Sequence, residues 1–292
     1  MMDAKIRPMP IDPATLRGLS EKLIQSHHEN NYSGAVKRLN AIRAQLATLP
    51  FSSTPGYTLN GLKREELIAA NSMILHELYF DGLGGDGKTM EPAMQLAFAA
   101  NFGGFDRWRE EFVSMGKALA GGSGWVLLSF NPREGTLVNQ WAPDHTHTLA
   151  GSVPLLALDM YEHSYHMDYG SAAGAYVDAF MDNVDLSKTY ARYRAAVHDA
   201  SEPYGATQEE LTGARVLDVR RAAVYEKSPA MIPDAQWRDP SRVGEWSAEL
   251  PTDRRVIVYC VYGHEVGRAT ALRLRAAGID AHFLRGGIDG WH

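Results

Sequence analysis

The side chains with the clearest chemistry in this sequence are a carboxylate and an imidazole at the end of an apolar run. Residues 153–158 read as a buried strand, Asp159 follows directly, and His163 comes four residues later. A hard oxygen and an imidazole nitrogen together suit first-row metals such as iron, manganese or zinc. An Asp and a His at this spacing more often form a surface hydrogen-bonded pair, so the pair alone leaves both interpretations open at this point.

Two more histidines lie in segments with helical periodicity. His76 falls in residues 62–80 and shares one predicted helix face with Ala69, Met73, Tyr79 and Phe80, so it should point into the interior. His27 is expected near the C-terminal end of an earlier helix. A histidine on an apolar face is more often a hydrogen-bonded core residue than a ligand. Neither residue therefore establishes a metal site alone.

Helices must supply most of the framework for these side chains. Apolar stripes predict a helix pair between residues 13 and 50, interrupted by the polar segment SHHENNYSG, and then the helix over 62–80. Further helices are expected at 92–101, 105–119, 175–183 and 187–198, and strands within 121–130, 137–141 and 153–158. The order predicts an α+β domain over residues 1–200, with a helical hairpin and a small antiparallel three-stranded sheet.

Composition narrows the classes of function. The net charge of the 292 residues is −6, and no dense Lys/Arg run occurs, which argues against a nucleic-acid partner. The only cysteine is Cys260, so no intrachain disulfide can form and a reducing compartment is expected. The N-terminus lacks a signal pattern and no window reaches the ~18 apolar residues of a membrane span. We therefore expect a cytoplasmic protein without a membrane partner.

A second domain is predicted after a polar, turn-rich linker at 201–213. Apolar strands at 214–220, 254–260 and 280–284 alternate with helices at 243–250 and 267–277. Strands that alternate with helices predict a parallel sheet with crossover connections. Residues 214–292 are therefore expected to form an α/β domain.

Cys260 stands where one of these strands ends, before the loop VYGHEV and a helix. Backbone N–H groups and the helix dipole aimed at the sulfur should lower its pKa and create an anion cradle. The alternative is a small buried apolar residue. Glu265 in the loop replaces cationic density, so thiosulfate should bind poorly, and His264 either assists a proton transfer or faces solvent.

The motifs HHENN, LHELYF, FGGFDRWREEF with GGSGWVLL, VNQW and LDMYEHSYH occur in order over residues 1–200. This series resembles the iron/manganese superoxide dismutases. The resemblance implies that His27, His76, Asp159 and His163 hold one iron or manganese ion per N-terminal domain and that superoxide is the substrate. The ligand set is the same for both metals, so it does not choose between them.

The resemblance also assigns roles to residues around the ion. Gln140 matches a glutamine that bonds the metal-bound solvent, and Ser72 occupies the helix position that supplies it in other members. Trp125 and Tyr161 match rings that wall the metal cavity. Glu162 matches a carboxylate that reaches across the interface of a homodimer or higher homo-oligomer. Without the resemblance, these residues would be a core amide, core aromatics and an exposed carboxylate.

Some positions depart from the family pattern. Asn31 and Ala35 stand where the family usually has a histidine and a tyrosine that gate the substrate funnel, and Tyr32 is a candidate substitute. His145 and His147 in the DHTH segment could extend the metal site, but a solvated loop is the expected structure. The metal cage is therefore a firmer prediction than rapid turnover.

The motifs LDVR, MIPDA, VIVYC, the Gly263 loop and GGIDGW resemble the rhodanese-like domains over about residues 207–292. The resemblance implies that Cys260 carries a persulfide or binds an oxyanion, with a sulfur donor or oxyanion as partner. The loop CVYGHEV resembles the variant associated with chromate resistance. Two hypotheses follow: a dismutase with an auxiliary thiol domain, or a degenerate dismutase fold that acts as a metal-containing sensor with Cys260 as its reactive thiol.

Overall fold

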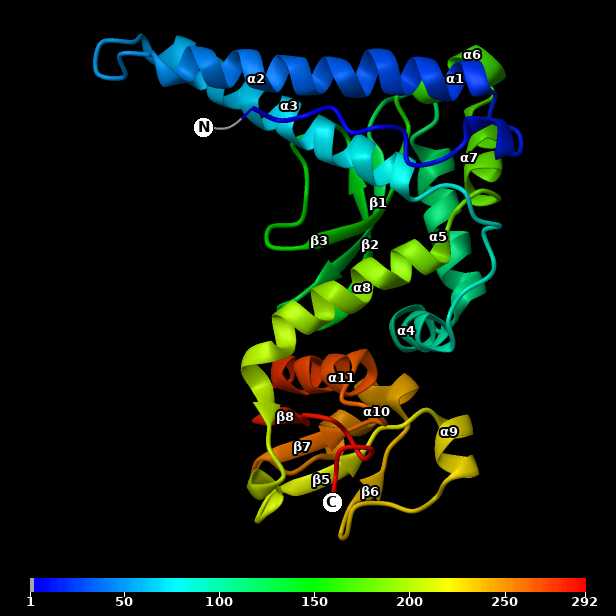
Figure 1. Cartoon of the computed structure of the whole chain (residues 1–292), viewed down its shortest axis with the longest axis vertical. Coiled ribbons are helices and arrows are strands. Elements are labelled where there is room, and N and C mark those ends of the chain that lie inside the picture. Colours follow the sequence, from blue (N-terminus) through cyan, green and yellow to red (C-terminus); the bar gives the residue numbers. More distant parts are fainter. Residues whose placement is uncertain (1–2) are drawn as a thin grey trace.

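The computed structural model describes residues 3–292, which form two stacked parts. Helices and a three-stranded antiparallel sheet make up the N-terminal part, and a five-stranded parallel sheet lies at the opposite end (Figure 1). This arrangement confirms the predicted order of an α+β part followed by an α/β part. No helix of the described residues combines the length and apolar character needed to cross a membrane.

One long helical rod opens the N-terminal part. It comprises α1 (Glu21–Ser26), a π-helix (His27–Tyr32) and α2 (Ser33–Ala47), and the hydroxyl of Ser20 caps its start by accepting from Leu23 N. The predicted break at SHHENNYSG is wrong, because these polar residues continue the helix with wider turns. The π segment places His27 in the interior, and such segments are frequent at functional sites.

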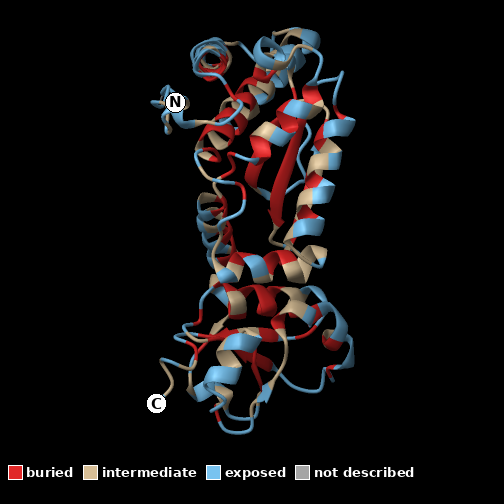
Figure 2. Cartoon of the chain, turned by 90° about the vertical axis from the view of Figure 1, so that its right-hand side faces the viewer, coloured by how far each residue is buried: buried red, intermediate tan, exposed pale blue. Residues whose placement is uncertain are grey.

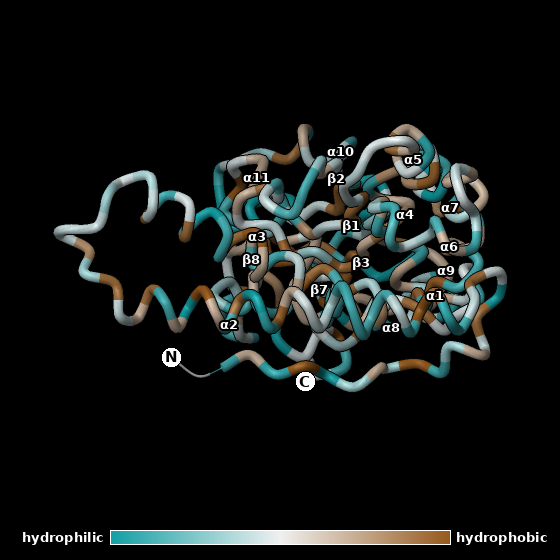
Figure 3. Tube along the Cα trace, turned by 90° about the horizontal axis from the view of Figure 1, so that it is seen from above, coloured by the Kyte–Doolittle hydropathy of each residue, from teal (hydrophilic) through white to brown (hydrophobic). Residues whose placement is uncertain are grey.

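Helix α3 (Gly56–Asp81) returns along α2 and starts six residues before the predicted boundary. Seen from above, the α2–α3 hairpin extends well beyond the rest of the molecule (Figure 3). Helices α4 (Pro92–Phe102) and α5 (Phe105–Ala118) follow as predicted. The apolar faces of these helices surround the small sheet, whose strands are largely buried (Figure 2).

The small sheet has the strand order β2-β1-β3, with β1 (Trp125–Asn131), β2 (Thr136–Ala142) and β3 (Val153–Asp159). Trp125 pairs with both Ala142 and Asp159, and directly opposed residues in antiparallel strands share a face. The sheet therefore presents Trp125 and Asp159 toward the same side. Helices α6 (His166–Tyr169), α7 (Ala173–Met181) and α8 (Leu186–Ser201) complete this part.

The second sheet has the order β4-β8-β7-β5-β6, and all its strands are parallel. Its strands are β4 (Gly205–Ala206), β5 (Arg215–Asp218), β6 (Gln236–Trp237), β7 (Val256–Tyr259) and β8 (Ala281–Leu284). Its helices are α9 (Ala222–Lys227), α10 (Val243–Trp246) and α11 (Glu265–Ala276). Short 3-10 turns cover Pro13–Thr15, Glu162–Ser164, Glu202–Tyr204, Glu209–Leu211, Pro240–Arg242 and Ser247–Glu249.

The segment 201–213, which the sequence predicted as a linker, belongs partly to the second sheet. Its strand β4 pairs with β8, so Gly205 and Ala206 form an edge of that sheet. Strands β4 and β6 could not be predicted from the sequence, because a two-residue strand shows no periodicity.

The two parts share buried surface. Helix α11 lies against α8, and its residues Ala269 and Leu272 belong to the same apolar cluster as Phe130 and Tyr193. Gly135, in the turn between β1 and β2, approaches α11 so closely that a Cβ atom there would lie 2.7 Å from Leu272 Cβ. The second part is therefore docked against the first through α11.

Candidate functional site

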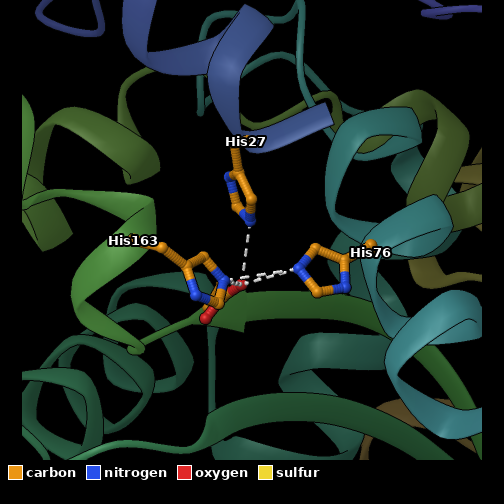
Figure 4. A group of neighbouring side chains, drawn as sticks. His27, His76 and His163 are labelled. Atoms are coloured by element: carbon orange, nitrogen blue, oxygen red, sulfur yellow. Dashed lines mark hydrogen bonds and ion pairs between the residues drawn. The ribbon is translucent and has the colours of Figure 1, made fainter. Parts of the chain in front are cut away.

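Four side chains, from two helical segments and the end of one strand, meet in the N-terminal part (Figure 4). His27 comes from the π-helix, His76 from α3, Asp159 from the end of β3, and His163 from the 3-10 turn that follows. Each offers one ligand atom, and these atoms lie within 4.8 Å of one another. The structure thus brings together all four residues predicted as metal ligands.

The contacts converge on one carboxylate oxygen. Asp159 Oδ2 lies 3.0 Å from His27 Nε2, 3.1 Å from His163 Nε2 and 3.4 Å from His76 Nε2. Atoms bound at about 2 Å to a common ion stand roughly 2.8–3.5 Å apart, so these separations fit a single ion. Three imidazole nitrogens and a carboxylate are a donor set that suits iron or manganese.

Hydrogen bonds fix the orientation of these ligands. His76 Nδ1 donates to the backbone oxygen of Ser72 at 2.6 Å, which leaves Nε2 without a proton and free to bind an ion. Asp159 Oδ1 accepts from Tyr161 N at 2.9 Å. The hydroxyls of Ser164 and Tyr176 donate to the backbone oxygen of Asp159, each at 2.8 Å. The cage is therefore held rigid by its surroundings.

The electrostatics also favour a bound cation. Burial lowers the pKa of His27 and lowers that of His76 to about 3, so both rings are neutral. Burial alone would lower the pKa of His163, but the Asp159 carboxylate outweighs it and the pKa is raised. Burial opposes ionisation of Asp159, yet His163 and His27 lower its pKa overall. The cage carries a buried carboxylate that a metal ion would neutralise.

Aromatic rings form the wall expected around the cage. The Trp125 ring lies edge-on to His76, with centroids 5.3 Å apart, and Tyr161 stacks on His163 at 5.5 Å. Burial raises the pKa of Tyr161 to about 12, so its hydroxyl stays protonated. Both rings therefore lie against histidines of the cage.

His145 lies beside this wall, although its segment was expected to be a solvated loop. Its Nδ1 accepts from Trp125 Nε1 at 2.9 Å, and its ring stacks on Tyr161 with centroids 4.8 Å apart. Burial lowers its pKa, so the ring is neutral. The expectation is therefore wrong for His145 and right for His147, which is exposed. In the sequence, only the unusual DHTH segment pointed to a role for His145 near the cage.

Among the described residues, Gln140 makes no hydrogen bond to the four residues of the cage. Its Nε2 donates to His147 O at 3.4 Å, and its buried Oε1 has no partner among the described residues. A cavity of about 250 Å³ adjoins His76 and His163, and its lining includes His145 and not Gln140. The ring of His145, rather than the amide of Gln140, therefore borders the approach to the cage.

The same cavity is lined by the two residues that replace the usual gate residues of the family. Asn31 and Ala35 line it, so no bulky side chain from these positions closes the approach. Tyr32 is not a substitute, because its hydroxyl donates to Glu77 Oε1 and accepts from Arg7 N, both at 2.9 Å and away from this cavity. Glu162 is exposed next to His163.

Cys260 lies just beyond the end of β7, at a second cavity of about 280 Å³ between the two parts. Its side chain is buried. Burial raises the pKa of the thiol, and the backbone N–H groups of Gly267, His264, Gly263 and Tyr262 only partly oppose this effect. The predicted lowering of the thiol pKa is therefore wrong, because desolvation of the thiolate outweighs the surrounding N–H groups.

Comparison with known proteins gives matches to both parts. Residues 90–192 match the family model of the C-terminal domain of iron/manganese superoxide dismutases, and residues 204–292 match that of the rhodanese-like domain. A superoxide dismutase [Fe] from Cupriavidus metallidurans is 64% identical over 195 residues, which span 67% of this chain and 98% of that protein. Superoxide dismutase [Mn] 1 from Halobacterium salinarum is 35% identical, with 67% and 98% covered. A superoxide dismutase [Fe] from Aquifex aeolicus is 32% identical, with 66% and 93% covered.

Proposed function

Because this chain belongs to the iron/manganese superoxide dismutase family, we propose that it converts superoxide into hydrogen peroxide and dioxygen with one iron or manganese ion. The observation that carries the proposal is the convergence of three imidazole nitrogens on Asp159 Oδ2. The name of the 64% identical relative favours iron.

When bound, iron or manganese supplies the one-electron chemistry, between the +3 and +2 states, that consumes two superoxide ions and two protons. The residues of the chain supply a matching charge: neutral imidazoles and one carboxylate keep the total charge low in both states. The cavity lined by Asn31 and Ala35 gives superoxide a path to His76 and His163. His145 keeps its proton on Nε2, since Nδ1 accepts from Trp125, and thus presents a neutral donor beside the cage.

For the rhodanese-like part, we propose that Cys260 is the reactive group and receives sulfur from a small donor. Of the two ligand classes implied by the family resemblance, a sulfur donor is better supported than an oxyanion, because Glu91 and Glu265 line the Cys260 cavity. A link to chromate resistance has only the loop CVYGHEV in its support. The lone cysteine supports a cytoplasmic location.

We also propose a homodimer or higher homo-oligomer in which Glu162 reaches the partner's cage. The exposure of Glu162 and of Met167, which is 47% exposed, supports an interface beside His163. Light scattering would give the mass of the assembly, and Glu162→Ala should shift it toward the monomer. A monomeric wild-type protein would contradict the proposal.

The dismutase proposal is tested on the full chain by elemental analysis and a superoxide assay after loading with iron or manganese separately. About one ion per chain and activity with one metal are expected, and Cys260→Ser should retain both. Absence of a bound ion would overturn the proposal. A bound ion without activity for either metal would favour the sensor hypothesis instead.

A further inference from the structure

The Cys260 cavity contains two carboxylates that the family resemblance does not explain. Glu91 precedes α4 in the first part, Glu265 begins α11 in the second, and both line the cavity with Cys260. The Oε2 atom of each is buried without a hydrogen-bond partner among the described residues. A buried acceptor without a partner is unfavourable, so a ligand that donates to these atoms would be stabilised.

Glu265 is fixed in place before any ligand arrives. The residue is only 7% exposed, and its Oε1 accepts from Tyr190 Oη of α8 at 2.9 Å. That contact crosses from one part of the molecule to the other and leaves Oε2 as the free acceptor. The carboxylate therefore presents one oxygen for a ligand in the cavity it lines.

Within residues 3–292, no arginine or lysine forms an ion pair with these two carboxylates. Arg220 lines the cavity, but its guanidinium donates to Asp218 Oδ2 at 2.8 Å and to the backbone oxygens of Ser228 and Ala230, each at 2.9 Å. Its charge is thus balanced by the buried Asp218. Arg221 also lines the cavity and is partly exposed, so it could accompany an anionic group of the ligand.

A metal ion is not the cation that fits this cavity. Among residues 3–292, the cage of the first part is the one group of histidine, cysteine and carboxylate side chains whose ligand atoms converge. Cys260, Glu91 and Glu265 instead surround about 280 Å³, which is room for a small organic molecule. The two carboxylates and the thiol therefore lie around the cavity and do not converge on one position that an ion could occupy.

We propose that the Cys260 cavity binds the persulfide of a small aminothiol, with the ammonium group at Glu91 and Glu265 and the outer sulfur at Cys260. The Cys260 thiolate attacks that outer sulfur, the S–S bond of the donor breaks, and the aminothiol leaves as its thiolate, so that Cys260 then carries the persulfide. This inference rests on the proposed role of Cys260 as a sulfur acceptor. It adds that the sulfur donor carries a positive charge near Glu91 and Glu265. The cavity accordingly selects cations or zwitterions and disfavours anionic donors such as thiosulfate.

The chain offers a direct test, because Cys260 is its only cysteine and every label on it reports this cavity. The full chain is treated separately with 2-aminoethyl methanethiosulfonate, a cation, and 2-sulfonatoethyl methanethiosulfonate, an anion. In each reaction the Cys260 thiolate attacks the sulfenyl sulfur, a disulfide forms, and methanesulfinate leaves. The two rates are divided by the rates of the same reagents with 2-mercaptoethanol, and mass spectrometry follows the labelling.

The normalised rate for the cation should exceed that for the anion by about tenfold or more, because two buried carboxylates act at short range. Glu91→Gln and Glu265→Gln keep the shape of the side chain and should each lower this ratio by roughly threefold or more. Glu249→Gln removes an exposed carboxylate outside the lining and should leave the ratio unchanged. Thermal unfolding of each variant checks that the fold is retained.

Equal rates, a faster anion, or a ratio unaffected by both glutamine variants would overturn the inference. So would failure of both reagents to label the native chain, since the cavity would then not lead to the sulfur. A charge-selective cavity in a protein that transfers no sulfur would leave the inference standing and refute only the sulfur-carrier role of Cys260.

Discussion

The metal cage and the Cys260 cavity differ in how their buried polar atoms are arranged. In the cage, ligand atoms from two helical segments and the end of one strand lie within 4.8 Å of one another, so one ion can satisfy all of them. In the Cys260 cavity, the thiol and two carboxylates line about 280 Å³ without converging. Convergent donors define a site for an ion, whereas dispersed donors define a site for a molecule.

Burial acts in both places with different chemical results. At His27 and His76 it lowers the pKa and keeps the imidazoles neutral, which is the form that binds a metal. At Cys260 it raises the pKa and keeps the thiol protonated, which is the less nucleophilic form. The imidazoles of the cage are therefore already in the form that binds an ion. The thiol of Cys260 must lose its proton before it reacts with a ligand in its cavity.

The largest effect is expected from breaking the cage. His76→Ala removes one of the converging nitrogens and leaves a buried carboxylate short of partners, so metal content and dismutase activity should fall on the order of 100-fold or more. Elemental analysis and a superoxide assay provide the measurements. His147→Ala, in an exposed loop position, is the matched control and should behave like wild type. Retention of the ion in His76→Ala would contradict the assignment of the cage.

A smaller effect is expected from replacing residues that lie beside the metal ligands, because such changes should lower activity more than metal content. His145→Ala removes the acceptor of the Trp125 N–H and the ring stacked on Tyr161, so activity should fall roughly 10- to 100-fold with most of the metal retained. Gln140→Ala should change activity less than about twofold, since its amide does not line the cavity. The reverse order would restore Gln140 as the residue that acts beside the ion.

The pH dependence of Cys260 labelling tests the second region. A raised thiol pKa means that less thiolate is present at pH 7 than in an ordinary cysteine, so the rate should rise by up to about tenfold per pH unit. The rise should continue above roughly pH 8.5, where an ordinary thiol levels off. Stopped-flow labelling with a neutral reagent gives the profile. A plateau below that pH would show that the N–H groups outweigh burial after all.

The smallest effect concerns the contact between the two regions. Gly135 has φ +66° and Gly151 has φ +77°, so replacement by alanine strains the backbone at both positions. Only at Gly135 would the new Cβ meet α11, whereas at Gly151 no atom of the described residues lies within 4 Å. Gly135→Ala should therefore cost about 1–3 kcal/mol more in unfolding free energy than Gly151→Ala. Urea unfolding followed by tryptophan fluorescence compares them, and equal costs would indicate two independently folding parts.

Much of the molecule could be predicted from its sequence. The helix periodicity around His76 and the apolar run before Asp159 placed both residues on the correct elements. Hydrophobic periodicity and apolar runs are visible within a short stretch of sequence. The predicted helical break at SHHENNYSG is wrong, since these polar residues are compatible with a π-helix that packs His27 against Phe80. Local polarity does not reveal such tertiary support.

The sequence by itself determined the donor types, the order of the elements and the presence of one thiol, because these depend on residue identity and short-range spacing. Only the tertiary structure decided that His145 rather than Gln140 borders the cage, that Tyr32 turns to Glu77, and that Glu91 joins Cys260 from the other part of the chain. It also decided the sign of the thiol pKa shift. Burial and contacts between residues far apart in sequence arise from packing, and no local pattern carries them.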